Sequence, residues 1–74
     1  MEYKAQEKRV KQIREQYPPG TRLQLDHMDD PYAPVPPGTQ GTVDFVDDAG
    51  QVHMQWDDGR TLALIPGVDC FHRI

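Results

Sequence analysis

The sequence predicts a mainly β fold, in which five short strands form a small barrel preceded by one α-helix. Residues 1–17 contain no glycine or proline and are followed by a Pro-Pro-Gly stop, which is the pattern of a helix. From residue 18 on, apolar residues recur at every second position between turn-forming residues, which is the pattern of short strands. We therefore expect two units, a charged helix at 1–17 and a barrel at 18–74.

The expected helix carries a narrow apolar stripe. Tyr3, Val10, Ile13 and Tyr17 fall on one side of it. A helix this short and polar is marginal alone in water. It is expected to dock on the barrel, to pair with a second copy of the chain, or to fray. The protein is accordingly expected to be a monomer or a helix-mediated homodimer.

The expected strands alternate polar and apolar residues. The third is the clearest, because Val52, Met54 and Trp56 share one face and make core. The fourth follows a tight Asp-Gly turn and buries Leu62 and Leu64. A barrel of such strands protects its own edges. The five strands are placed at 21–25, in the stretch from 38 to 46, at 51–56, at 60–65 and at 71–74.

The stretch from Asp26 to Pro37 is expected to be a surface loop, because its four prolines lack the amide donors that a strand ladder needs. Three carboxylates and an imidazole lie within residues 26–30. Their spacing lacks the frame and the closing glutamate of a calcium loop. No metal site is therefore expected, and the aspartates are interpreted as turn-capping, solvated residues.

Two motifs resemble the SH3-like barrel of KOW type: Pro-Gly-Thr-x-Gly-Thr-Val at 37–43 and Val-x-Met-x-Trp-Asp-x-Gly at 52–59. More narrowly, residues 17–74 resemble a family of small domains of unknown function from bacteria, their phages and conjugative elements. Pro-Gly-Thr-Arg at 19–22, Asp-Asp-Pro-Tyr at 29–32 and Pro-Gly-Val-Asp at 66–69 also carry this resemblance. It implies an SH3-like barrel and a mobile-element origin, and it implies no activity.

The residue types argue against catalysis. The chain has no serine, and its one cysteine, Cys70, is expected to be a half-buried structural residue although His72 follows it at strand spacing. One cysteine allows no internal disulfide, and no apolar run is long enough for a signal peptide or a membrane span. We expect a cytoplasmic protein without cofactor or enzyme activity.

Binding is the remaining class of function. We expect a protein partner to contact the acidic first loop and the 57–60 hairpin. A shelf of aromatic and acidic residues there suits a basic or proline-containing peptide. Trp56 has a second interpretation as a core residue, because it alternates with Val52 and Met54. The residues assigned to this site are Tyr32, Trp56, Asp57, Asp58 and Arg60.

Two alternatives stay open. The helix offers Lys4, Lys8, Lys11 and Arg14 to nucleic acid, as in a ribosome- or polymerase-associated protein. However, residues 18–74 carry a net charge of −6 against +2 for residues 1–17, and this balance disfavours nucleic acid. The same acidity permits an inhibitor that occupies the basic channel of a host defence nuclease.

Overall fold

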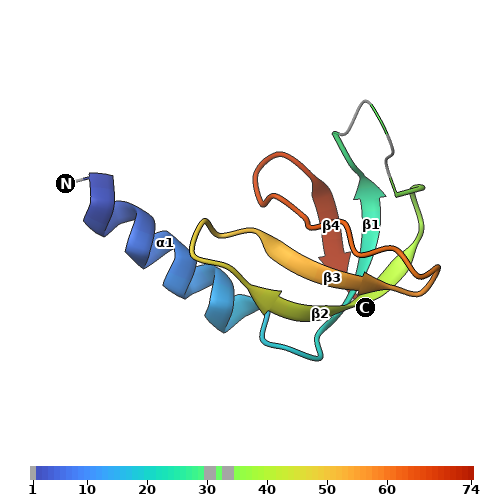
Figure 1. Cartoon of the computed structure of the whole chain (residues 1–74), viewed down its shortest axis with the longest axis horizontal. Helices are drawn as coiled ribbons and strands as arrows, with labels where there is room; N and C mark the ends of the chain where they lie inside the picture. The colour runs from blue at the N-terminus through green and yellow to red at the C-terminus, as the bar shows by residue number, and fades with distance from the viewer. Residues whose placement is uncertain (1, 30–31, 33–34) are drawn as a thin grey trace.

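The computed structural model describes residues 2–29, 32 and 35–74. The described residues form one helix and four strands, which confirms the mainly β class with an N-terminal helix (Figure 1). None of the described helices combines the length and the apolar character needed to cross a bilayer. The elements are α1 (Glu2–Gln16), β1 (Arg22–His27), β2 (Gln40–Val46), β3 (Val52–Trp56) and β4 (Cys70–Arg73).

The four strands form one antiparallel sheet in the order β3-β2-β1-β4. Strand β1 is paired on both sides, and its Leu23 and Leu25 are fully buried, as the alternating pattern predicts. The predicted face of β3 is also confirmed, because Val52, Met54 and Trp56 are buried. These residues make the core to which the other elements attach.

The expectation of five strands in a closed barrel is wrong. The fourth expected strand makes backbone–backbone hydrogen bonds with β3 only near its two ends. There the amide of Trp56 donates to the carbonyl of Arg60, and Val52 exchanges two hydrogen bonds with Leu64. Between these contacts the carbonyl of Leu62 accepts the indole N–H of Trp56 at 2.8 Å. The indole therefore takes the place of a backbone donor. The segment bows out of the sheet, and Leu62 is 37% exposed instead of buried.

Trp56 occupies its buried position because Gly41 lies opposite it on β2. A Cβ at position 41 would lie 2.8 Å from the Cε3 atom of the Trp56 ring, well inside van der Waals contact. Glycine in a strand commonly marks such a close approach. The two residues thus fix each other's place in the sheet.

The first loop is only partly the surface loop that its prolines predict. Its far end returns along β1, because the amide of Gly38 donates to the carbonyl of Leu25 at 2.7 Å. Met28 and Val35 are thereby buried in the core. The prediction of a surface loop from Asp26 to Pro37 is wrong for Met28 and Val35, which are buried, and for Asp26 and His27, which belong to β1.

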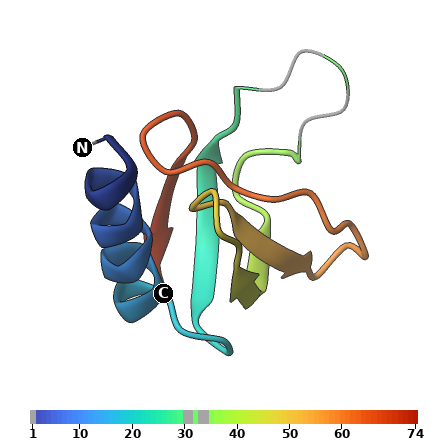
Figure 2. The same cartoon turned by 60° about the vertical axis from the view of Figure 1, so that its left-hand side comes forward.

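The helix docks on the sheet, which is one of the three outcomes expected for it. Val10 and Ile13 are buried in the common core, and Figure 2 shows α1 standing alongside the sheet. Arg14 of α1 also donates to the carbonyl of Val46 at 3.3 Å. The side chain of Tyr3 lies outside the described part of the structure.

We expect Gly41→Ala to lower the free energy of unfolding by about 1–3 kcal/mol, because the added methyl group meets the ring and backbone of Trp56. Urea-induced unfolding followed by circular dichroism measures this change. Gln55→Ala alters an exposed position of β3 and should change the value by less than about 0.5 kcal/mol. A Gly41→Ala protein as stable as the wild type would contradict the packing of Trp56 on this glycine.

Candidate functional site

The carboxylate of Asp57, in the 57–60 hairpin, is bound within the molecule. Arg22 of β1 donates to both of its oxygens, at 2.8 and 2.7 Å. This hydrogen bonding holds the pKa of Asp57 below its ordinary value and raises the pKa of Arg22. A basic ligand at Asp57 therefore competes with an existing bidentate pair.

The other hairpin residues are also engaged. Asp58 accepts the amide of Arg60 at 3.0 Å and lies 3.4 Å from its Nε atom. Trp56 is 3% exposed, so the structure places it in the core and not on a binding platform. The hairpin thus presents a compact set of internally paired charges.

Tyr32 lies on the loop between β1 and β2 and is 93% exposed. The grouping of Tyr32 with the hairpin residues in one site stays a prediction from the sequence.

Asp26 and Asp29 of the first loop contact different parts of the molecule. Asp26 lies 2.8 Å from Nδ1 of His72, and the amide of Asp29 donates to the carboxylate of Asp69. Asp30 lies outside the described residues. Within residues 2–29, 32 and 35–74, no three acidic, histidine or cysteine side chains are grouped as a metal ion requires.

Cys70 is exposed, so the expectation of a half-buried cysteine is wrong. It begins the edge strand β4, where the next residue, Phe71, turns inward and packs on Tyr17 with ring centroids 5.4 Å apart. Cys70 and His72 consequently share the outward face of β4. The pairing of His72 with Asp26, which lies 46 residues away, was not predicted from the sequence.

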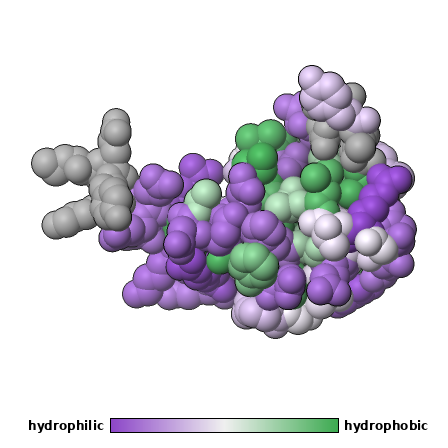
Figure 3. All heavy atoms as spheres, viewed as in Figure 1, coloured by the Kyte–Doolittle hydropathy of each residue, from purple (hydrophilic) through white to green (hydrophobic). Residues whose placement is uncertain are grey.

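An exposed apolar surface lies on the segment that follows the hairpin. We call Leu62, Ile65 and Val68 the apolar segment; they are 37%, 43% and 47% exposed. Figure 3 shows apolar side chains gathered where the turn before β4 lies. This surface was not predicted from the sequence, because Leu62 was assigned to the buried face of a strand.

The backbone of the apolar segment is fixed. The amides of Val68 and Asp69 both donate to the carbonyl of Ile65, at 3.0 and 2.9 Å. The buried carboxylate of Asp69 accepts the amide of Ile65 at 2.8 Å and the amide of Asp29 at 2.9 Å. The exposed side chains of Ile65 and Val68 therefore project from a turn that is held at both ends.

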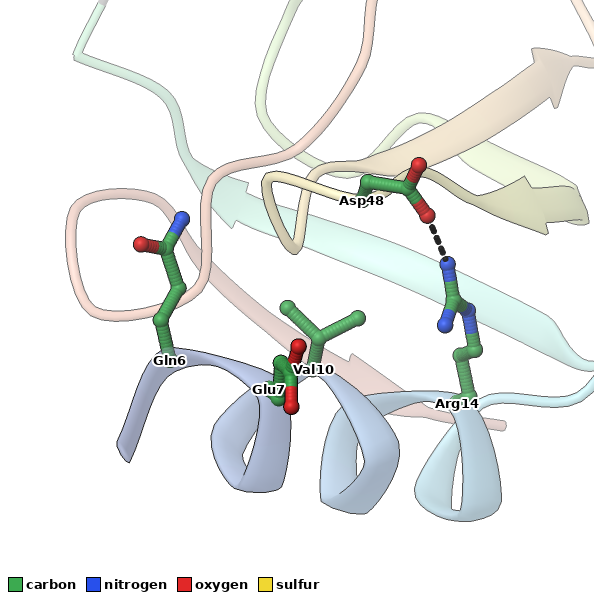
Figure 4. A pocket seen from close by; sticks show the side chains of 5 residues that line it. All are labelled: Gln6, Glu7, Val10, Arg14 and Asp48. Carbon is green, nitrogen blue, oxygen red and sulfur yellow. Dashed lines mark hydrogen bonds and ion pairs between the residues drawn. The ribbon is translucent and has the colours of Figure 1, made fainter. Parts of the chain in front are cut away.

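Two open hollows lie between α1 and the rest of the chain. One, of about 470 Å³, borders the apolar segment, and Arg9 spans its edge by donating to the carbonyl of Pro66 at 3.2 Å. The other, of about 550 Å³, is crossed by the ion pair of Arg14 and Asp48 at 2.8 Å (Figure 4). The residues lining the first are Gln6, Arg9, Val10, Ile13, Ala49, Gly50, Ile65 and Pro66.

The basic residues of the helix differ in their surroundings. Arg14 is paired with Asp48. Lys8 and Lys11 are exposed, and their ammonium groups have no hydrogen-bond or ion-pair partner among the described residues. The side chain of Lys4 is outside the described part of the structure. Two of the four predicted nucleic-acid contacts are thus open to solvent.

The turn between β2 and β3 is organised by Asp47. Its carboxylate accepts the amides of Ala49 and Gln51 at 3.0 and 2.9 Å and lies 2.8 Å from Nε2 of His53. The hydrogen bond to His53 is the largest cause of the lowered pKa of Asp47. Such an aspartate fixes a turn through its side chain.

Residues 6–74 match the protein family described as "Domain of unknown function (DUF4314)". The chain belongs to this family. The match begins inside α1, so the family domain includes most of the helix together with the sheet. It is thus wider than the resemblance at residues 17–74. Searches of the curated proteins and of the solved structures find no match.

We expect the pKa of Asp47 to rise when His53→Phe removes the imidazole donor and keeps a ring on β3. The folded-state pKa of Asp47 lies below its unfolded value. Its carboxylate therefore stabilises the fold above the unfolded pKa, and this contribution is lost as the pH falls through the folded pKa. Titration of the carboxyl carbons by NMR measures the change.

The control in this titration is Asp57, whose pKa is lowered by Arg22 and should be the same in both proteins. An unchanged pKa of Asp47 in the His53→Phe protein would contradict the assigned role of the imidazole.

Proposed function

We propose that this DUF4314 protein is a non-enzymatic interaction module and that the apolar segment is its main contact surface for a protein partner. The observation that carries the proposal is the exposure of Ile65 and Val68 on a turn with a fixed backbone, and of Leu62 on the segment before that turn. Grouped apolar side chains on the surface of a small domain mark interaction sites. A fixed backbone lowers the entropic cost of binding.

The choice of the apolar segment replaces the 57–60 hairpin as the proposed centre of the interface. Asp57 is paired with Arg22, and Trp56 is buried. Tyr32 keeps its place as a contact residue, because it is 93% exposed and aromatic side chains are enriched in interfaces.

We also propose that the fold is related to SH3-like barrels as an open variant. The support is the order β3-β2-β1-β4 together with the Val52–Leu64 bridge, which leaves the segment after the hairpin beside β3. The KOW-type relationship, the phage or mobile-element origin and the cytoplasmic location stay predictions from the sequence. Inhibition of a host nuclease by the acidic residues 18–74 also stays a hypothesis.

A second candidate function is association with nucleic acid through the helix. The observation that favours it is the exposure of Lys8 and Lys11, whose ammonium groups have no partner among the described residues. Lysines in this state can release counterions from phosphates. The net charge of −6 on residues 18–74 opposes this function.

We expect Ile65→Ser and Val68→Ser to reduce capture of the partner by about tenfold, because each removes a central apolar contact. The measurement is affinity capture from cells of the source organism, quantified by mass spectrometry. Ile74→Ser is the matched control, since Ile74 is 54% exposed but lies outside the apolar segment. Circular dichroism verifies that all three variants are folded. Equal capture by wild type and Val68→Ser would refute the proposed surface.

The nucleic-acid candidate predicts that binding to mixed oligonucleotides weakens steeply with salt. Lys8→Ala and Lys11→Ala should each reduce the slope of log affinity against log salt by about 0.9 for duplex DNA. Gln12→Ala, at an exposed position of the same helix, should leave the slope unchanged. Absence of binding at low salt would eliminate this candidate.

A further inference from the structure

A β-bulge in β2 turns two consecutive side chains toward solvent. Val43 is paired with Met54 and Phe45 with His53, so Asp44 has no residue opposite it. Both Asp44 and Phe45 are exposed, whereas the flanking Val43 is buried. Bulges are frequent next to binding sites because they re-aim side chains in this way.

The ring of Phe45 is a fixed aromatic surface. It stacks on the imidazole of His53 with centroids 4.3 Å apart and planes 5° from parallel. His53 is in turn held by Asp47 at 2.8 Å. Phe45 is nevertheless 48% exposed. Since the imidazole covers one ring face, the exposed area includes the other face, to which a planar cation can stack.

The carboxylate of Asp44 is available beside this ring. The carboxylate of Asp44 makes no hydrogen bond or ion pair with any described residue. In this it differs from Asp47, Asp57 and Asp58, whose carboxylates are all bound. Asp44 also borders a shallow hollow of about 400 Å³ between β2 and β3.

The negative net charge of the surrounding residues favours a basic ligand. Residues 18–74 carry a net charge of −6, which attracts a basic partner. An exposed aromatic face next to an unpaired carboxylate suits a guanidinium better than an ammonium group. A guanidinium is planar, so it can stack on a ring and direct its N–H donors to a carboxylate at the same time.

We propose that Asp44 and Phe45 bind an arginine side chain from a basic segment of a protein partner. The guanidinium stacks on the free face of Phe45 and donates hydrogen bonds to Asp44, while His53 and Asp47 hold the ring in place. The residues of this site do not belong to the apolar segment, so the proposal does not depend on that segment. The occupant is a protein segment, because the acidic surroundings repel nucleic acid and anionic membranes.

The test is an NMR titration of the full chain, labelled with ¹⁵N, with the peptide acetyl-Gly-Arg-Gly-Arg-Gly-amide. We expect chemical-shift changes centred on residues 44, 45 and 53. The matched peptide with citrulline, which is neutral and of the same shape, should not bind, and the lysine peptide should bind more weakly. Asp44→Asn and Phe45→Leu should each weaken binding about two- to fivefold.

The control variant is Asp29→Asn, which removes the same charge from an exposed carboxylate that has no partner among the described residues. It should leave the affinity unchanged. An equal loss of peptide affinity in Asp29→Asn and Asp44→Asn would show that the peptide is bound by non-specific charge attraction and not by this site. Equal affinity for the citrulline peptide, or shift changes confined to the 57–60 hairpin, would overturn the proposal. Phe45→Leu keeps an apolar side chain at position 45, so the test does not depend on an unfolded variant.

Discussion

The burial of Trp56 is the constraint on which the rest of this structure depends. The indole occupies the space above Gly41, where no other residue type fits without a collision. Its N–H donates to the carbonyl of Leu62. One side chain thus sets the approach of β2 to β3 and holds the following segment away from the ladder. Both the strand pairing and the exposed apolar segment follow from where this ring lies.

Local patterns were sufficient for much of the fold. The helix ends before Pro18 as the proline stop requires, and β1 and β3 bury the residues that alternation assigns inward. Local patterns failed where a contact outside the strand ladder decides the outcome. The exposure of Leu62 depends on a hydrogen bond from the side chain of Trp56 to the Leu62 carbonyl, and the burial of Val35 depends on a loop that returns to β1. The alternation of polar and apolar residues encodes neither contact.

The bulge in β2 is another feature that the alternation of polar and apolar residues does not predict. Strict alternation places Val43 and Phe45 on one face, and the bulge turns Phe45 outward while Val46 is buried. The consecutive apolar residues Phe45 and Val46 are the only signal of this switch in the sequence, and they do not say which of the two faces inward. For the candidate site, the amino-acid composition predicted that the aspartates are exposed. It did not predict which residues pair with them, because a partner such as Arg22 lies 35 positions from Asp57 in the sequence.

The carboxylate of Asp69 has a consequence for how so small a domain keeps its shape. It joins the loop after β1 to the turn before β4, two segments 40 residues apart, through two backbone amides. Domains of this size often rely on a covalent staple between such segments. Here a buried side chain makes the equivalent cross-link, and it does so in a chain with a single cysteine. These hydrogen bonds form on folding and are lost on unfolding. Unlike a disulfide, they need no oxidant to form and are not broken by reductants.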